Sequence, residues 1–329
     1  MHQEYMVCIN CMTYNQADYI GDALNGFCMQ KTNFPYVVVL IDDASTDNEP
    51  TIIKSFIKNS LNFTLSTKEE TSDFVRIIAS HKTNHNITFV IVLLKYNHYL
   101  KKSKLPYYKE WLDKSKYIAV CEGDDYWIDP LKLQKQVDIL EENVSVSLVY
   151  TAFQTVDNRG NDFYRENYEK FMRRSFSGNN LPELFNMNYI LTCTVAYRKE
   201  LLETREYKEG SRLDYGLFLA AASYGDFYYL TDKTASYRLN PNSLTATKNP
   251  IVAQGIFSSY KFYASLFLEG LPKEQSYDDE LLCARNILKQ SRLHGFIHLE
   301  LGILKKYKML REGNIFHYLY LYFKCLIRK

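Results

Sequence analysis

The chain has 329 residues, of which 46% are hydrophobic and 24% are charged, so it can form a large core and does not have the composition of a disordered or fibrous protein. Its 40 basic and 38 acidic residues give a net charge of +2, which argues against a general nucleic-acid-binding protein. The seven cysteines are odd in number and lack the paired short spacings of a zinc site, so we expect free thiols.

Two features of the sequence concern the cellular location of the protein. The N-terminal sequence MHQEYMVCIN has no long apolar run, so we expect no signal peptide. We find no stretch of 18 uncharged apolar residues, so we expect no membrane-spanning helix. Together these features predict a cytoplasmic protein.

Apolar runs typical of buried strands alternate with segments of helical period along the first half of the chain. Strands are predicted at residues 6–11, 36–41, 88–94, 117–121 and 146–152, and helices at 16–27 and 131–142. This order predicts an α/β fold with a Rossmann-like, mostly parallel central sheet flanked by helices. Residues 59–86 and 155–185 are expected to be irregular. Helical segments follow Pro250, so we divide the chain into a catalytic domain at 1–248 and a helical C-terminal extension at 249–329.

The first predicted strand ends in Met12-Thr13-Tyr14-Asn15, directly before a predicted helix. Ligands of open α/β sheets bind beyond the carboxyl ends of the strands, so these polar groups can face a nucleotide. An asparagine that caps the helix gives the same pattern, and this alternative stays open.

The second predicted strand ends in two adjacent carboxylates, Asp42 and Asp43, followed by Ser45, Thr46 and Asp47. A carboxylate at this position can accept hydrogen bonds from a nucleobase N–H or from ribose hydroxyls. The three residues that follow are typical helix caps, and the alternative for the carboxylates is a solvated turn.

The fourth predicted strand ends in Cys121-Glu122-Gly123-Asp124-Asp125-Tyr126-Trp127, with three acidic residues within four positions. Such side chains repel one another unless a cation is present, and their hard oxygen atoms suit Mg²⁺ or Mn²⁺. Gly123 allows a tight turn and a close approach of a ligand. The alternative is an exposed acidic turn.

The order of these three turns resembles that of the family-2 glycosyltransferases, over roughly residues 5–245. Their pattern is a Thr-Tyr-Asn turn, an Asp-Asp-x-Ser-Thr-Asp turn and an acidic DxD-like turn, and the Cys-Glu-Gly-Asp-Asp-Tyr-Trp stretch is similar to members that build bacterial cell-surface polysaccharide. The resemblance implies a GT-A fold and an inverting, metal-dependent enzyme. It also implies that Asp43 contacts the nucleoside, that Asp124 and Asp125 serve the metal and the diphosphate, and that Glu122 stands at the first acidic position.

Two later segments extend the resemblance. Asp214 precedes an apolar helix, where similar proteins carry the catalytic base; a simple helix cap is the alternative. Residues 236–240 resemble a Tyr-Arg-x-His strand, with Arg238 retained and Asn240 where histidine is common. Met12 likewise replaces the usual proline before threonine. The complete set of candidate site residues is Thr13, Tyr14, Asn15, Asp42, Asp43, Asp124 and Arg238 for the nucleotide, Asp124 and Asp125 for Mn²⁺ or Mg²⁺, Asp214 for catalysis, and Glu122, Trp127 and Asn240 for acceptor or diphosphate contacts.

The expected reaction transfers a sugar from a nucleotide-diphosphate sugar, with a UDP-sugar as the first choice, to a glycan hydroxyl in surface polysaccharide synthesis. A nucleotidyltransferase is an alternative, but it would need a glycine-rich and basic first turn, which residues 12–15 do not provide. A catalytically inactive nucleotide-sugar-binding or scaffold protein is the other alternative.

The C-terminal stretch 315–327 is aromatic and lies between basic residues. As a helix it is too short to cross a bilayer of about 30 Å at about 1.5 Å per residue. It is expected either to pack on this protein or a second subunit, or to lie at the inner face of the cell membrane beside a lipid-linked glycan acceptor.

Overall fold

The chain forms two compact units that interleave along the sequence. The computed structural model describes residues 4–62, 66–99, 101–210, 213–240, 250–312 and 314–327, without the side chains of residues 309 and 323–327. The first unit comprises Met1–Ser175, Ile190–Lys199 and Tyr228–Ser243, and the second comprises Phe176–Tyr189, Glu200–Phe227 and Leu244–Lys329. The predicted boundary at residue 248 lies outside the described residues. Residues 176–189 and 200–227, which we assigned to the catalytic domain, group with the C-terminal helices.

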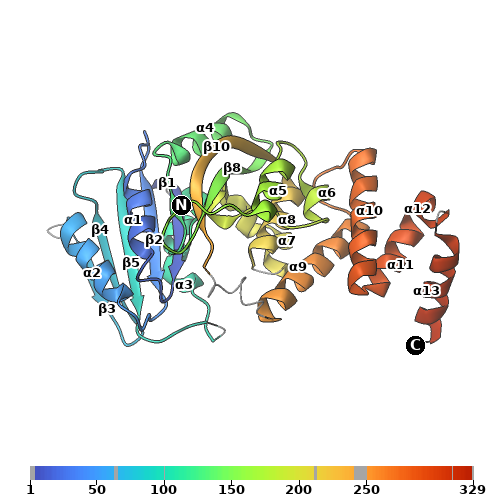
Figure 1. Ribbon diagram of the computed structural model, residues 1–329, viewed down its shortest axis with the longest axis horizontal. Coiled ribbons are helices and arrows are strands. Elements are labelled where there is room, and N and C mark those ends of the chain that lie inside the picture. Colours follow the sequence, from blue (N-terminus) through green and yellow to red (C-terminus); the bar gives the residue numbers. More distant parts are fainter. Residues whose placement is uncertain are drawn as a thin grey trace. The chain divides into compact units, whose positions relative to one another are not determined.

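The first unit is built on a ten-stranded sheet with the order β3-β4-β5-β2-β1-β6-β9-β8-β10-β7 (Figure 1). The strands are β1 (Tyr5–Thr13), β2 (Tyr36–Asp42), β3 (Thr67–Glu70), β4 (Phe74–Ser80), β5 (Ile87–Leu94), β6 (Ser115–Val120), β7 (Tyr126–Trp127), β8 (Val146–Val156), β9 (Ala196–Arg198) and β10 (Asp226–Arg238). All five strands predicted from the sequence are therefore present.

The sheet is parallel at its centre and antiparallel at its flanks. β1 pairs in parallel with β2 and β6, and β2 pairs in parallel with β5. The pairs β3–β4, β4–β5, β6–β9, β8–β9 and β7–β10 are antiparallel. The segment 59–86, predicted to be irregular, contains β3 and β4. β3 has the sequence TKEE and is exposed throughout, so its sequence lacks the apolar pattern that marks a strand.

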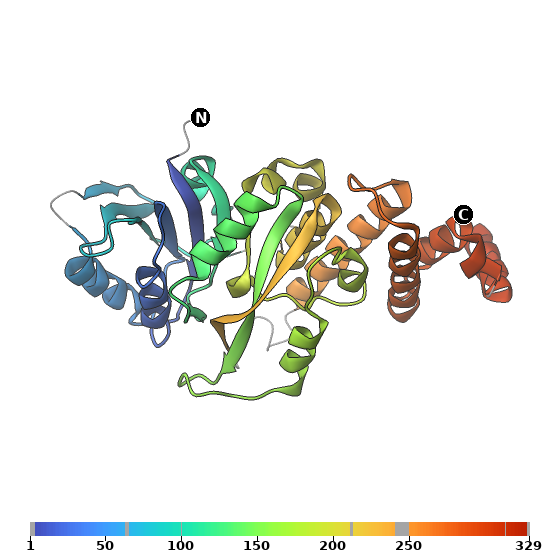
Figure 2. The same cartoon turned by 90° about the horizontal axis from the view of Figure 1, so that it is seen from above.

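Three helices cover one face of the sheet: α1 (Ile20–Cys28), α2 (Glu49–Ser60) and α4 (Lys132–Glu142). Phe27, Ile53 and Leu140 from these helices join one buried core with Val7 and Val38 from the strands. α3 (Leu105–Asp113) follows β5 and leads to β6, on the other side of β1, so a right-handed crossover puts it on the opposite face (Figure 2). The turns after β1, β2 and β6 thus lie together at one end of the sheet, where the carboxyl ends of these parallel strands meet.

The second unit is helical. Its helices are α6 (Leu181–Leu184), α7 (Arg205–Glu209), α8 (Asp214–Tyr224), α9 (Pro250–Glu269), α10 (Tyr277–His294), α11 (Ile297–Lys306), α12 (Lys308–Glu312) and α13 (Ile315–Ile327). α5 (Glu166–Arg174) belongs to the first unit. The predicted helical C-terminal part is confirmed for the described residues. Among them, no helix is both long and apolar enough to cross a membrane.

Candidate active site at the strand ends

A buried glutamate links the turns that follow β1 and β2. Glu49 is the first residue of α2 and is fully buried. Its carboxylate accepts the backbone N–H of Gln16 and the hydroxyl of Ser45, both at 2.8 Å, and it also accepts the hydroxyl of Thr13. Burial raises the pKa of this carboxyl above its usual value. Sequence reasoning missed Glu49, because an acidic residue in a first helical turn is ordinarily an exposed complement of the helix dipole.

Asn15 joins the same two turns from the outside. It adopts the left-handed conformation, with φ 54°, and its Oδ1 accepts the backbone N–H of Thr46 at 2.8 Å. The backbone N–H of Asn15 donates to Ser45 Oγ at 2.9 Å. Asn15 therefore organises the second turn rather than capping α1, whose N-cap is Tyr19. Tyr14, beside it, is exposed and free to meet a ligand.

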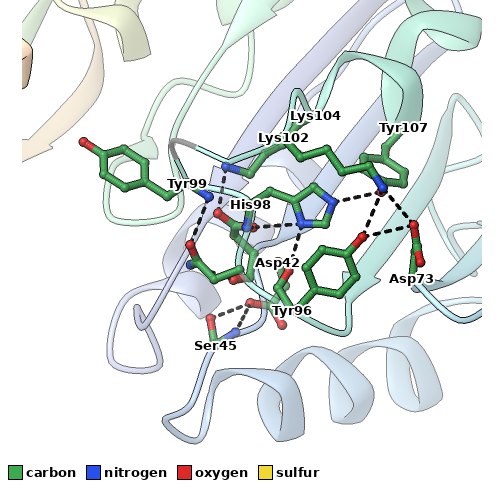
Figure 3. A network of polar contacts seen from close by, with 11 residues as sticks. Asp42, Ser45, Asp73, Tyr96, His98, Tyr99, Lys102, Lys104 and Tyr107 are labelled. Atoms are coloured by element: carbon green, nitrogen blue, oxygen red, sulfur yellow. Dashed lines mark hydrogen bonds and ion pairs between the residues drawn. The ribbon is translucent and has the colours of Figure 1, made fainter.

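The two carboxylates after β2 have different partners. Asp42 is 1% exposed and accepts the backbone N–H of Ser45 at 3.0 Å, and burial raises its pKa. Asp43 is 4% exposed, and these low values exclude the solvated turn. Its Oδ1 accepts the backbone N–H of His98 at 2.7 Å, and its Oδ2 lies 2.8 Å from Lys104 Nζ. Figure 3 shows the polar network to which His98 and Lys104 belong.

The acidic turn after β6 packs directly on the turn after β1. The backbone N–H of Gly123 donates to Met12 O at 3.1 Å. A Cβ atom on Gly123 would lie 2.4 Å from Thr13 Oγ1 and 2.5 Å from Gln16 Oε1. Such contacts are closer than a Cβ atom can approach, so any other residue here would force Thr13 or the turn to shift, and the two turns share one surface.

The three acidic side chains of this turn divide into separate environments. Asp125 is 4% exposed, and its Oδ1 accepts the backbone N–H of Arg238 at 2.8 Å. Burial first, and then the neighbouring Asp124 carboxylate, raise the pKa of Asp125 well above its usual value. Asp124 is partly buried; burial raises its pKa, and the charge of Arg238 opposes that effect. Glu122 accepts the hydroxyl of Thr192 at 2.8 Å.

Arg238 holds the acidic turn in place. Its Nε donates to the backbone oxygen of Asp124 at 2.9 Å, and its Nη2 pairs with Asp22 at 2.7 Å. The guanidinium lies 4.6 Å from the ring centre of Tyr19 and 5.3 Å from that of Tyr126. Its side chain is 2% exposed. The structure thus gives Arg238 a positioning contact with the acidic turn, and its predicted nucleotide contact stays a prediction.

Trp127 lies in the core rather than in an accessible site. It is 1% exposed, its Nε1 donates to Cys193 O at 2.9 Å, and its ring packs edge-on against Phe27. The structure therefore gives Trp127 a core position, and its predicted acceptor or diphosphate contact stays a prediction. Asn240 is half-buried after β10, and its backbone N–H donates to Arg238 O at 3.0 Å.

Asp214 belongs to the second unit, at the first position of α8. The nine residues after it, from Tyr215 to Ser223, are all buried, whereas Asp214 itself is exposed. The N-cap is Leu213, which makes no side-chain capping bond. Desolvation by its surroundings raises the pKa of the Asp214 carboxyl above its usual value, whereas the helix dipole at this end favours the ionised form. Asp214 is thus an exposed charge on a buried helix and does not occupy the capping position.

The divalent metal implied by the resemblance can be tested against the acidic turn. Within the described parts of the chain, no group of three or more His, Cys, Asp or Glu side chains gathers as a metal site. Asp125 already accepts a buried N–H, so Asp124 is better placed to supply an oxygen ligand to the metal. Glu122 lies two residues before Asp124. Hard oxygen ligands suit Mg²⁺ and Mn²⁺, and Mg²⁺ commonly takes one or two carboxylates together with phosphate oxygens. The turn fits a metal completed by a diphosphate.

A separate open hollow lies at the opposite end of the parallel strands. It is lined by residues 28–33 and 83–86 with Leu131 and Gln134. The first two segments directly precede β2 and β5, so the hollow is at the amino ends of parallel strands. It is distinct from the three turns, which follow the carboxyl ends, where ligands of such sheets bind.

The sequence comparisons give one family match and several relatives. Residues 8–79 match the model described as glycosyl transferase family 2, a region that contains the turns after β1 and β2. Uncharacterized protein Rv1520 of Mycobacterium tuberculosis is 28% identical over 238 residues, which are 71% of this chain and 58% of that protein. Uncharacterized protein Mb1547 of Mycobacterium bovis has the same identity and coverage. The chain thus spans less than two thirds of the length of the curated relatives it matches.

The structural comparisons concern the fold. The crystal structure of Staphylococcus aureus TarS residues 1–349 in complex with UDP-GlcNAc aligns with a TM-score of 0.57 at 15% identity, over 91% of this chain and 79% of that one. The UDP complex of the same protein aligns with a TM-score of 0.55 at 15% identity, over 91% and 80%. The chain has a GT-A-type fold.

Proposed function

We propose that this chain, whose residues 8–79 match the model of glycosyl transferase family 2, transfers a sugar from a nucleotide-diphosphate sugar to an acceptor hydroxyl, with inversion at the anomeric carbon. The observation that carries the proposal is the mutual packing of the three polar turns. Gly123 lies against Thr13, and Thr13 is bonded through Glu49 to the turn of Asp42. Unrelated acidic loops would have no reason to be joined in this way at the carboxyl edge of parallel strands.

The donor would bind along these turns. Asp43 is the proposed nucleoside contact, with Tyr14 exposed on the neighbouring turn. Asp124 is the proposed ligand for Mn²⁺ or Mg²⁺, which when bound would offset negative charge on the departing diphosphate. TarS, which has the same fold at 15% identity, holds UDP and UDP-GlcNAc in its crystals, so UDP-sugars are the first donors to test.

Asp214 is the proposed catalytic base. Its carboxylate would take the proton of the acceptor hydroxyl while the hydroxyl oxygen forms a bond to the anomeric carbon and the bond from that carbon to the diphosphate breaks. One displacement of this kind inverts the anomeric carbon and needs no covalent intermediate. The exposure of Asp214 on an otherwise buried helix is the observation that favours this role over capping.

The proposed acceptor is a glycan or a lipid-linked glycan of a surface polysaccharide pathway. Exposed apolar side chains on α13 support contact with the inner face of the membrane, and a homo-oligomer formed through the C-terminal helices is the alternative partner. The exposed set is Ile315, Phe316, Leu319, Tyr320 and Tyr322.

The test is a screen of nucleotide sugars by thermal unfolding with and without Mn²⁺, followed by donor hydrolysis. A ligand that binds the native state at about 100 times its Kd stabilises it by about 2.7 kcal/mol, so a specific donor gives a clear shift. Metal-dependent stabilisation together with sugar release supports an active transferase. Stabilisation without any release supports an inactive binding protein, and no response to any nucleotide sugar contradicts the proposal.

A further inference from the structure

An ordered turn follows β8 at the same end of the sheet as the acidic turn. β9 is antiparallel to both β6 and β8, so β8 runs parallel to β6, toward the acidic turn. Residues 157–164, which we name the aromatic turn, come directly after β8 and lead to α5 (Figure 2). The aromatic turn therefore lies beyond the carboxyl ends of the strands, where ligands of such sheets bind.

Arg238 ties the aromatic turn to the acidic turn. Its Nη1 donates to the backbone oxygens of Asp157 and Asn158, at 3.3 and 3.4 Å. Its Nε donates to the backbone oxygen of Asp124 at 2.9 Å. One side chain that is 2% exposed thus holds both turns, so a group bound on the aromatic turn is close to the proposed metal and diphosphate site.

The backbone of the aromatic turn is fixed by its own hydrogen bonds. The Asp157 carboxylate accepts the backbone N–H of Asn161 at 2.9 Å. Phe163 donates its N–H to Thr155 O at 2.9 Å, and its carbonyl oxygen accepts the Thr155 hydroxyl. Gly160 supplies a positive φ of 82°, which favours glycine. The side chains that leave this turn therefore project from a defined backbone.

Two adjacent aromatic side chains of this turn face solvent. Tyr164 is 68% exposed and Phe163 is 41% exposed. A hydrogen bond to the Glu169 carboxylate raises the pKa of Tyr164, and it holds the tip of the ring while most of the side chain stays accessible. The Arg165 guanidinium lies 5.5 Å from the ring centre of Phe163. Tyr164 is therefore the main accessible platform of the turn.

The polar neighbours of the two rings fit a saccharide. Asn158, Arg159 and Asp162 are exposed on the same turn. Their amide, guanidinium and carboxylate groups supply both donors and acceptors of hydrogen bonds. A sugar ring has a face of C–H groups, which packs on a flat aromatic ring, and a rim of hydroxyls, which pairs with such polar groups. Apolar contact with a few polar groups around it is also the usual make-up of a ligand site.

We propose that the aromatic turn is the acceptor-binding surface, on which Tyr164, with Phe163 beside it, packs against a sugar ring of the glycan that receives the donor sugar. This inference rests on the proposed function, because only a transferase has to hold an acceptor beside its donor. Transfer requires the acceptor hydroxyl and the anomeric carbon to be held in a defined geometry. The bonds of Arg238 to both turns keep a bound acceptor at a fixed position relative to the donor.

The experiment uses methyl glycosides and disaccharides of glucose, galactose, mannose, rhamnose and N-acetylglucosamine as probes. They are offered with Mn²⁺ and the donor selected by the nucleotide-sugar screen. Saturation-transfer NMR detects sugar binding, and product formation gives the acceptor KM. We expect at least one probe to bind the wild type and accept sugar. Tyr164→Ala should raise its KM by about 3- to 10-fold, and Phe163→Ala with Tyr164→Ala by about 10- to 100-fold, while the Kd of the nucleoside diphosphate stays the same.

Two further variants separate the ring contact from unspecific effects. Tyr277→Ala is the matched control, because Tyr277 of α10 is 67% exposed and belongs to the second unit, and it should keep the wild-type KM. Tyr164→Phe keeps the ring without its hydroxyl, so it should keep most of the affinity for the acceptor. All of these side chains are exposed, so the unfolding temperatures should match that of the wild type.

Three results would overturn the inference alone. One is a double variant that binds and uses the probes as Tyr277→Ala does. Another is a wild type that hydrolyses its donor but binds no probe. The third is a double variant that loses binding to phosphatidylserine vesicles and keeps its acceptor KM, which would make the aromatic turn a lipid contact. A wild type that binds no nucleotide sugar with or without Mn²⁺ overturns the proposed function, and the inference with it.

Discussion

The two units present their candidate functional groups in opposite ways. In the first unit, the polar side chains at the strand ends bond to one another, and Asp42, Glu49 and Asp125 are almost fully buried. In the second unit, Asp214 and the apolar face of α13 are exposed. Substitutions among these strand-end groups should therefore change ligand binding and stability together, whereas those in the second unit should change one function and leave the fold intact.

The largest expected effect comes from Asp214→Asn. Loss of a general base lowers the transfer rate by a factor on the order of 10²–10⁴, and an exposed isosteric change should not disturb α8. Transfer assays and calorimetry with the nucleoside diphosphate check this, and donor affinity and the unfolding temperature should stay at the wild-type level. Transfer at the wild-type rate would leave Asp214 with no catalytic role.

The next effect separates Asp124 from Asp125 in the first unit. Asp124→Asn replaces a charged oxygen ligand by a neutral amide, so the Mn²⁺-dependent part of donor affinity should fall by about 10- to 100-fold. Asp125→Asn retains an acceptor for the Arg238 N–H, whereas Asp125→Ala leaves that buried group unsatisfied at a cost of about 1–3 kcal/mol. Calorimetry with and without Mn²⁺, combined with urea unfolding, measures both. Unchanged Mn²⁺-dependent affinity in Asp124→Asn and Asp125→Asn alike would contradict the metal assignment.

Gly123 tests whether binding and stability are coupled in the first unit. Gly123→Ala places a methyl group within 2.4 Å of Thr13 Oγ1, and overpacking of this kind costs about 1–3 kcal/mol. We expect a lower midpoint in urea and weaker donor binding in the same variant. Gly21→Ala is the control, because no atom lies within 4 Å of its added Cβ on α1 and alanine favours a helix. Equal stability of the two variants would show that the turns tolerate separation.

Part of this site could be predicted from the sequence because its contacts join residues that are close together in the chain. Apolar strands that end in polar turns gave the positions of Thr13, Asp42 and Asp124, and the bond from Asp42 to Ser45 spans only three residues. The same reasoning placed α1 too early, at residue 16 instead of Ile20. Residues 15–19 form a turn that begins with left-handed Asn15, which an apolar periodicity cannot indicate.

The remaining contacts could not be predicted, because they join residues far apart in the chain. Arg238 reaches Asp22 across 216 positions, so the sequence could not show that its side chain also holds the acidic turn. Lys104 was one of many lysines until the fold brought it to Asp43. Trp127 looked accessible beside an acidic turn, but the packing against Phe27 buries it. Burial and pairing of this kind depend on the tertiary structure.

A smaller effect is expected at Lys132, a lysine fully buried beneath the acidic turn. Its Nζ contacts Gln136 Oε1 at 2.6 Å and Thr194 O at 3.1 Å, and burial lowers its pKa to about 7 from the usual 10.5. Between these values the unfolded chain holds a proton that the folded chain has lost, so the contribution of Lys132 to the free energy of unfolding rises with pH in this window. Lys132→Met should flatten that rise in urea unfolding at pH 7, 8.5 and 10. Lys135→Met, which removes a surface lysine paired with Asp129, should not flatten it.

The smallest effect on catalysis is expected from substitutions on α13, which should change only the binding of the protein to membranes. Phe316 is 86% exposed, and Ile315, Leu319, Tyr320 and Tyr322 are exposed on the neighbouring positions of the helix.

Basic side chains lie near this apolar face, which we propose to contact the membrane. Lys305 Nζ lies 5.6 Å from the ring centre of Tyr322, and Arg311 lies 5.8 Å from that of Tyr318. Each basic residue near an anionic lipid surface contributes about 1 kcal/mol, and aromatic side chains favour the headgroup depth. Phe316→Glu with Tyr320→Glu, or deletion of residues 312–329, should therefore release the protein from phosphatidylserine vesicles in co-sedimentation while donor hydrolysis stays at the wild-type rate.

Leu293→Glu provides the control, because Leu293 is 71% exposed on α10 outside the apolar face of α13. Vesicle binding that survives both the double variant and the deletion rules out α13 as the anchor. If the wild type binds no vesicles but sediments as a dimer that the double variant loses, the face joins two copies of the chain, and the exposed chemistry of the second unit serves assembly instead of the membrane.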